Sequence, residues 1–133
     1  MANGLYDFGR ESFLSGDISW DADTIKCVLV DTGTYTVNLA THQYLSSLSG
    51  TVGTAATLGT KTVTAGVADA ADVTYTAVTG ATCEAVVIYK DTGVAATSIL
   101  IAYIDTATNL PVTPNGGNIG ISWDNGASKI FKL

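Results

Sequence analysis

The sequence predicts one all-β domain over residues 1–133, a β-sandwich of about seven short strands for which a jelly roll is one candidate arrangement. One or two short helices are expected near the N-terminus. Three observations predict this class. Short runs rich in β-branched and aromatic residues fill the chain from residue 60 onward, turn signals separate them, and no helical pattern alternates with them. A chain of 133 residues suits a single domain whose core needs no disulfide or metal.

The N-terminal segment, residues 1–20, is expected to begin with a short amphipathic helix between residues 5 and 14. Gly16 follows this helix as a stop signal. The apolar positions of the helix pattern are Leu5, Phe8 and Phe13. This segment is also a candidate arm for contacts with other proteins.

The first strand is predicted at residues 24–30, which are rich in β-branched residues and end at the turn signal of residues 31–33. Residues 35–38 are expected to be a short extended piece. Residues 41–48 fit one or two helical turns with Thr41 as the N-cap.

A long surface loop is predicted at residues 49–59, where small and polar residues offer almost no bulk for a core. We expect this loop to become ordered in an assembly. Residues 61–65 and 73–78 alternate between polar and apolar side chains, as a half-buried strand does, and residues 67–72 are expected to link them.

A hairpin is predicted between residues 83–90 and 97–105, joined across the Asp-Thr-Gly turn at residues 91–93. Both arms are apolar at nearly every position. Strands of this kind are covered on both faces, so the hairpin should be central in its sheet.

A second hairpin is predicted between residues 118–123 and 128–133, because Asp124-Asn125-Gly126 lies between them. Asn-Gly is a strong hairpin signal, since both residues tolerate a positive φ. Residues 110–117 are expected to join the two hairpins irregularly.

The composition predicts a protein that hides part of its surface against other proteins. Hydrophobic residues make up 47% of the chain and charged residues only 14%, with a mean hydropathy of +0.31. No run approaches the 18 apolar residues of a membrane span, so a membrane protein is not expected. The N-terminus also lacks the basic and apolar regions of a signal peptide, which predicts synthesis in the cytoplasm. Interface cores are depleted in charged residues, so assembly accounts for the composition.

The charge distribution argues against direct binding of nucleic acid. The net charge is −6, and the six basic residues are scattered along the chain. A nucleic-acid surface needs a basic stripe that displaces counterions from phosphates. A protein of this kind on a DNA-filled container should therefore lie on its outside.

No arrangement of reactive residues predicts an enzyme, a metal centre or a cofactor site. His42 is the only histidine, and we expect it on a surface or a helix face. Cys27 and Cys83 lie in apolar strand patterns and are expected to be buried free thiols, although the sequence leaves a disulfide between them open. The sequence also leaves open a weak calcium site at two aspartate pairs, although turn and capping roles are commoner: Asp21 with Asp23, and Asp69 with Asp72.

Several segments together resemble a family of small virion proteins of tailed bacteriophages. The resembling segments are Gly9-Arg10-Glu11-Ser12-Phe13-Leu14, Ile18-Ser19-Trp20, residues 23–31, Gly117-Asn118-Ile119, Trp123-Asp124-Asn125-Gly126 and Lys129-Ile130-Phe131. They are structural rather than catalytic motifs and span most of the chain. Residues 49–59 do not match.

The resemblance implies a virion component without enzymatic activity, of the head-decoration or cement kind. Its partners would be the major capsid protein or other virion proteins and further copies of itself, and its location the capsid exterior. Two alternatives stay open: a tail, neck or baseplate subunit, and a receptor-binding or glycan-binding module of the virion.

Nine apolar residues are the candidate contacts with partners, although ordinary core packing is an equally good explanation of the aromatic ones. They lie in the N-terminal segment, in the predicted loop and at the C-terminal edge: Leu5, Tyr6, Phe8, Phe13, Val52, Leu58, Ile130, Phe131 and Leu133.

Overall fold

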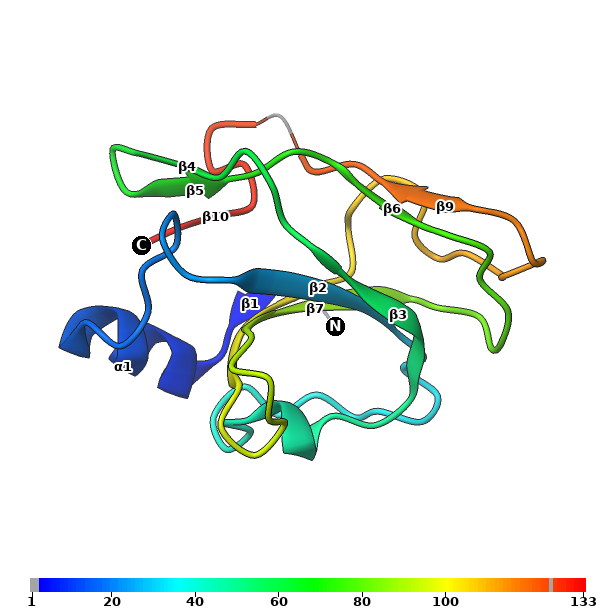
Figure 1. Ribbon diagram of the computed structural model, residues 1–133, viewed down its shortest axis with the longest axis horizontal. Helices are drawn as coiled ribbons and strands as arrows, with labels where there is room; N and C mark the ends of the chain where they lie inside the picture. Colours follow the sequence, from blue (N-terminus) through cyan, green and yellow to red (C-terminus); the bar gives the residue numbers. More distant parts are fainter. Residues whose placement is uncertain (1–2, 125) are drawn as a thin grey trace.

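The computed structural model of the chain describes residues 3–124 and 126–133 (Figure 1). These residues form antiparallel sheets with one short α-helix, so the all-β prediction is confirmed. The elements are β1 (Gly4–Leu5), α1 (Asp7–Ser15), β2 (Ile25–Val30), a 3-10 turn (Leu45–Ser47), β3 (Thr51–Thr57), β4 (Thr62–Thr64), β5 (Val67–Asp69), β6 (Val73–Tyr75), β7 (Ala85–Lys90), β8 (Ile99–Ile104), β9 (Ile119–Ile121) and β10 (Phe131–Lys132).

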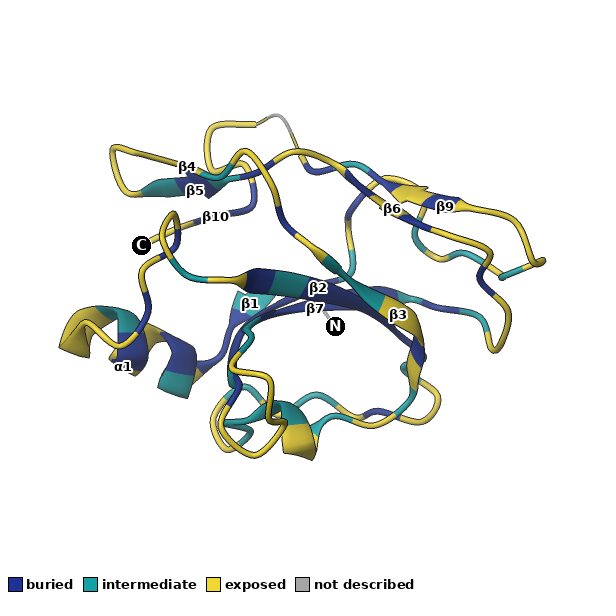
Figure 2. Cartoon of the chain, in the orientation of Figure 1, coloured by how far each residue is buried: buried dark blue, intermediate teal, exposed yellow. Residues whose placement is uncertain are grey.

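The central element is a five-stranded sheet in the order β1-β8-β7-β2-β3. Its three inner strands are buried at almost every position (Figure 2). Two separate apolar clusters explain this, one on each face, since successive side chains of a strand point to opposite faces. In β2, for example, Cys27 and Leu29 belong to one cluster, and Val28 and Val30 to the other. The predicted central hairpin is therefore confirmed as β7 paired with β8.

Two smaller sheets lie over one face of the five-stranded sheet (Figure 1). One has the order β10-β5-β4, and the other pairs β6 with β9. Their inward side chains share one apolar cluster with the central sheet, including Ala68, Tyr75, Ile121 and Phe131. Inside this cluster the hydroxyl of Tyr75 donates a 2.8 Å hydrogen bond to the carbonyl of Cys27 on β2, which ties the layers together.

The opposite face of the central sheet is covered by irregular chain, residues 31–50, with the loop between β7 and β8 beside it (Figure 1). Tyr6 and Tyr35 fill this second cluster and expose at most 2% of their surface. Their hydroxyls are 2.8 Å apart and hydrogen-bonded. The two buried hydroxyl groups therefore satisfy each other's need for a hydrogen bond.

From residue 4 onward the N-terminal segment packs against the central sheet. Residues 4 and 5 pair with β8, and the amide of Tyr6 donates to the carbonyl of Ile101. The helix consequently begins at Asp7, later than the predicted residue 5, and ends at Gly16, whose φ of 84° gives it the left-handed cap that glycine favours.

The prediction of a loop at residues 49–59 is wrong, because residues 51–57 form β3. This strand pairs with β2 in two short registers, with a bulge opposite Val28. Gly53, with φ of 72°, lies in the bulge. Backbone pairing with β2 holds residues 51–57 in a strand, so this segment needs no bulky side chains to form one.

The prediction of a second local hairpin is also wrong for the described residues. β9 pairs with β6, and β10 pairs with β5, so the two arms pair with strands about 45–65 residues earlier in the chain. Trp123 explains the choice: its amide donates to the Asp72 carboxylate and its indole to the carbonyl of Ala71. Asn125, the central residue of the predicted turn, lies outside the described residues.

Three smaller predictions need correction. The helical turn expected within residues 41–48 is a 3-10 turn over residues 45–47. Thr41 is not its cap; the Asn38 side chain instead accepts from the amides of residues 40 and 41. Residues 67–69, expected in a link, form β5. Within the described residues, no helix has the length and apolar character that a membrane span requires.

Candidate interaction surface

The two cysteines are free and fully buried, as predicted. Burial raises the pKa of the Cys27 thiol to about 12. The pKa of Cys83 is raised to about 11, by burial first and then by the nearby carboxylates of Glu84 and Asp31. Both side chains are therefore neutral thiols at neutral pH, and neither is a nucleophile.

His42 lies at the end of a hydrogen-bonded chain of hydroxyls. Its Nδ1 is 2.7 Å from the hydroxyl of Tyr35, which is bonded in turn to Tyr6. The imidazole is half-buried and lies in irregular chain rather than on a helix. Desolvation raises the pKa of both tyrosines, so the chain holds neutral phenols. These hydrogen bonds satisfy the buried hydroxyls of Tyr6 and Tyr35 beneath the central sheet.

The aspartates that the sequence raised as calcium ligands have structural partners. Asp23 accepts a 2.8 Å hydrogen bond from the amide of Ser19 and pairs with Lys90 at 3.3 Å. The amide bond first, and then the lysine, hold the pKa of this carboxyl below its usual value. Asp72 accepts from the amide of Trp123. No group of three or more possible metal ligands occurs in the described part of the chain.

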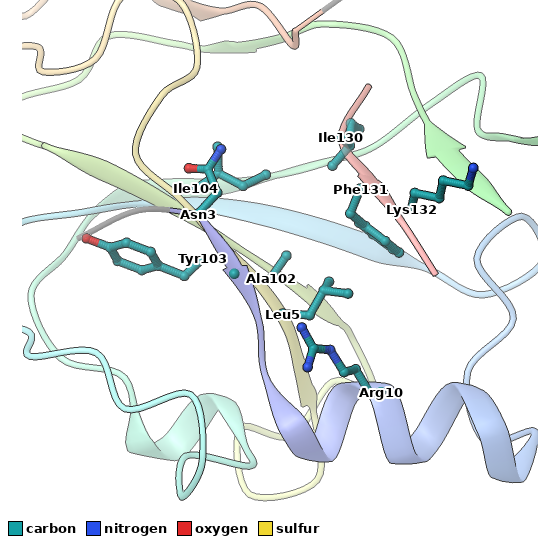
Figure 3. A pocket seen from close by; sticks show the side chains of 10 residues that line it. Asn3, Leu5, Arg10, Ala102, Tyr103, Ile104, Ile130, Phe131 and Lys132 are labelled. Carbon is teal, nitrogen blue, oxygen red and sulfur yellow. The ribbon is translucent and has the colours of Figure 1, made fainter. Parts of the chain in front are cut away.

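The hollows on the surface are small. The one in Figure 3 holds about 180 Å³ and lies between β1, β8, α1 and β10. Arg10 of the helix and Lys132 of β10 stand at its rim, and Leu5 and Phe131 line it. Pockets that enclose small ligands usually measure about 300–1,000 Å³, so this hollow is too small to enclose one.

The most apolar hollow lies at the end of the molecule where the β4–β5 hairpin, the C-terminus and α1 meet (Figure 1). We call it the end groove; it holds about 230 Å³. Three packed aromatic rings, Phe13, Trp20 and Phe131, form its floor. Phe131 meets Trp20 edge to face with ring centres 5.2 Å apart, and meets Phe13 at 5.8 Å. The Trp20 indole donates to the carbonyl of Asp69, which fixes the ring.

The rim of the end groove carries unusually exposed apolar side chains. Val63 and Leu133 line it and are 56% and 58% exposed. Leu14, at the end of α1, is 89% exposed but does not line the groove. Two exposed apolar side chains on one apolar groove mark a candidate interaction surface.

The nine predicted contact residues fall into three groups by burial. Six are buried within the protein's own core: Leu5, Tyr6, Val52, Leu58, Ile130 and Phe131. Phe8 and Phe13 are half-buried, and Leu133 is exposed. Phe13, Phe131 and Leu133 come together at the end groove.

Sequence reasoning missed Val63 and Leu14 as exposed apolar residues. Val63 carries the signal of an ordinary alternating strand, and nothing in the sequence says that its strand lies at the edge of a sheet. Leu14 is an apolar residue of α1, but its side chain is exposed to solvent.

No protein-family model matches the chain, and no curated protein matches it either.

Proposed function

We propose that this chain is a non-enzymatic structural protein of a tailed-phage virion, which decorates the outside of the capsid shell and cements it through protein–protein contacts. The observation that carries the proposal is the exposed apolar rim of the end groove, on a domain whose other large apolar side chains in the described residues, apart from Leu14 and Val94, are buried or half-buried. The resemblance of its motifs to small virion proteins of tailed phages is the reason to propose a virion as the location.

The charge of the chain supports an external position. With a net charge of −6, the protein would be repelled by packaged DNA and would sit on the outer surface of the shell. The low charged fraction suits a subunit that covers much of its surface with neighbouring proteins. It would act as a homo-oligomer bound to the major capsid protein, with no cofactor.

We infer that the fold is a β-sandwich, with the five-stranded sheet as one layer and the two small sheets as the other. The shared apolar cluster between these sheets supports this assignment. The chain also passes between the layers three times, after β3, after β6 and after β8, which is the kind of crossing that a jelly roll or Greek key requires.

A cement role can be tested with particles that lack this protein. Each decoration subunit adds contacts across capsomer seams, and many weak contacts together resist the pressure of packed DNA. Particles assembled without the chain should release their DNA at a lower temperature, and adding the purified chain should restore the wild-type temperature.

The alternatives give different results in the same experiment. A tail, neck or baseplate subunit would leave the release temperature of filled heads unchanged when it is absent. A receptor-binding or glycan-binding module would change adsorption to host cells while heads stay equally stable. Either result would contradict the cement proposal.

A further inference from the structure

The β4 strand is an open sheet edge with an apolar residue at its centre. Its three residues, Thr62, Val63 and Thr64, are all exposed, and they carry no charge. The strand joins β5 through a two-residue turn, Ala65-Gly66, in which both residues have positive φ, as a type I′ hairpin requires. Natural proteins usually protect such edges with lysine, proline or a bulge, and β4 itself contains none of these. Lys61 directly precedes β4, but its ammonium donates to the carbonyl of Asp23.

Val63 is the last member of an inward-facing row that crosses the small sheet. Phe131 lies opposite Ala68, and Ala68 opposite Val63, so the three side chains point to the same face. This face is the end groove, which all three line. Their exposed fractions are 9%, 5% and 56%, so the row is sheltered except at the β4 edge.

The backbone of Val63 also points away from the protein. Ala68 uses its carbonyl toward β10, where it accepts a hydrogen bond from the amide of Ile130. In an antiparallel pair, directly opposite residues either exchange both hydrogen bonds or exchange none. Since the polar groups of Ala68 face β10, its opposite residue Val63 directs its own N–H and C=O to the open edge.

We propose that β4 pairs antiparallel with β4 of a second copy of this chain, with Val63 on the two-fold axis. Val63 of each copy then donates its N–H to the carbonyl of Val63 in the other. Thr62 of one copy lies opposite Thr64 of the second copy, and the two sheets join into one six-stranded sheet. The apolar row continues across the axis, from Phe131 of one copy to Phe131 of the second copy.

Symmetry and the neutral facing residues favour a second copy as the occupant. Two molecules of net charge −6 repel each other, but the facing strands are neutral and set valine against valine and threonine against threonine. A two-fold axis needs a patch that is complementary to itself, and an antiparallel strand centred on one residue has this property. The longer edge strand β3, at the edge of the five-stranded sheet, is interrupted by its bulge, so it offers no continuous row of free groups.

The size of the patch predicts weak association in solution. Three residues of strand span about 10 Å, which cannot bury the roughly 1,200–2,000 Å² of a stable complex. We therefore expect a dissociation constant between about 10 µM and 1 mM. On an array of bound subunits the local concentration is far higher, and the same pairing would link neighbours. The β4–β4 pairing is the contact that would form the proposed homo-oligomer. It rests on the proposed function only in this respect, and not on the cement role.

Sedimentation equilibrium of the full chain over a range of concentrations tests the pairing. The wild type should form a reversible dimer, and Val63→Lys should weaken it at least about tenfold, because it puts a charge on the apolar row and at the two-fold axis. Val94→Lys is the matched control: Val94 is 57% exposed but lies in the loop between β7 and β8, so its dimer should match the wild type. A wild type that stays monomeric to about 1 mM, or a Val63→Lys variant that associates as well as Val94→Lys, would overturn the proposal.

A second variant separates the pairing from general damage to the fold. Val63→Pro removes the N–H that the register turns away from β5, so the melting temperature should change little while the dimer is lost. In the wild type, exchange of the Val63 amide should slow as concentration rises. Exchange that does not depend on concentration would contradict the pairing. A dimer that behaves as expected, combined with normal DNA release from particles lacking the chain, would contradict the cement function and leave the pairing intact.

Discussion

The contact between α1 and β8 leaves no room for a side chain at Gly9, and this predicts the effect of Gly9→Ala. A Cβ built at this position would lie 2.6 Å from the carbonyl oxygen of Leu100 and 3.1 Å from the Cα of Ile101. Both are backbone atoms of a central strand, so they cannot swing aside. The helix would have to move off the sheet by about 0.8 Å to reach an ordinary contact of 3.4 Å.

Two effects of Gly9→Ala oppose each other, and their magnitudes decide the sign. Alanine is a better helix former than glycine by about 1 kcal/mol, which favours the variant. Overpacking a rigid site costs about 1–3 kcal/mol, and a clash with backbone belongs at the upper end of this range. We therefore expect a net loss of about 2 kcal/mol in the free energy of unfolding, or roughly 5–10 °C in the melting temperature.

Urea and thermal unfolding, followed by circular dichroism, measure this loss. Gly120→Ala is the matched control, because a Cβ there meets nothing within 4 Å and the position has no positive φ. This control should be as stable as the wild type or slightly more stable, since alanine restricts the unfolded chain. A Gly9→Ala protein as stable as Gly120→Ala would refute the close docking of α1.

Three further predictions concern buried and charged groups. Tyr35→Phe leaves the fully buried hydroxyl of Tyr6 without its partner, so the free energy of unfolding in urea should fall by about 1–3 kcal/mol. Adding Tyr6→Phe to this variant should cost little more or even restore stability, because both hydroxyls are then gone. Strictly additive losses of stability would contradict the hydrogen-bonded pair. Cys27 and Cys83 should not react with a thiol reagent in the native protein at pH 7.5, and both should react in urea; rapid labelling of the native state would refute their burial. The fold lowers the pKa of Asp23, so the stability that its carboxylate contributes is complete above the unfolded pKa of about 4 and is lost as pH falls through the folded pKa. Asp23→Asn should therefore reduce the loss of stability between pH 5 and 2, by less than about 1 kcal/mol. An unchanged acid profile would contradict the prediction.

Local patterns in the sequence predicted the parts of the fold that local patterns control. The continuous apolar runs of β7 and β8 require cover on both faces, and the structure supplies two clusters. The helix that stops at Gly16 and the strand β2 were likewise predictable. Each of these elements is determined by residues within about ten positions of one another.

Pairings between distant segments could not be predicted. The Asn-Gly signal at residues 125–126 suggests a local hairpin, but Trp123 binds Ala71 and Asp72, and the flanking strands pair elsewhere. Residues 51–57 have no bulky side chains, and only their pairing with β2 makes them a strand.

The candidate surface was predictable in part. Phe13, Phe131 and Leu133 were candidates and do meet at the end groove, but an apolar pattern cannot say whether a side chain faces its own core or a partner. The open edge at Val63 depends on where β4 lies in its sheet, and a single sequence does not contain that order.

The proposed role, coating a phage capsid in many copies, is tested most directly by the copy number of this chain per purified particle. Quantitative gel densitometry or mass spectrometry against the major capsid protein gives this number. A decoration protein should be present in hundreds of copies per head, in a fixed ratio to the capsid protein, as closed shell symmetry requires. About six or twelve copies per particle would place the chain in the tail or neck, and none at all would remove it from the virion.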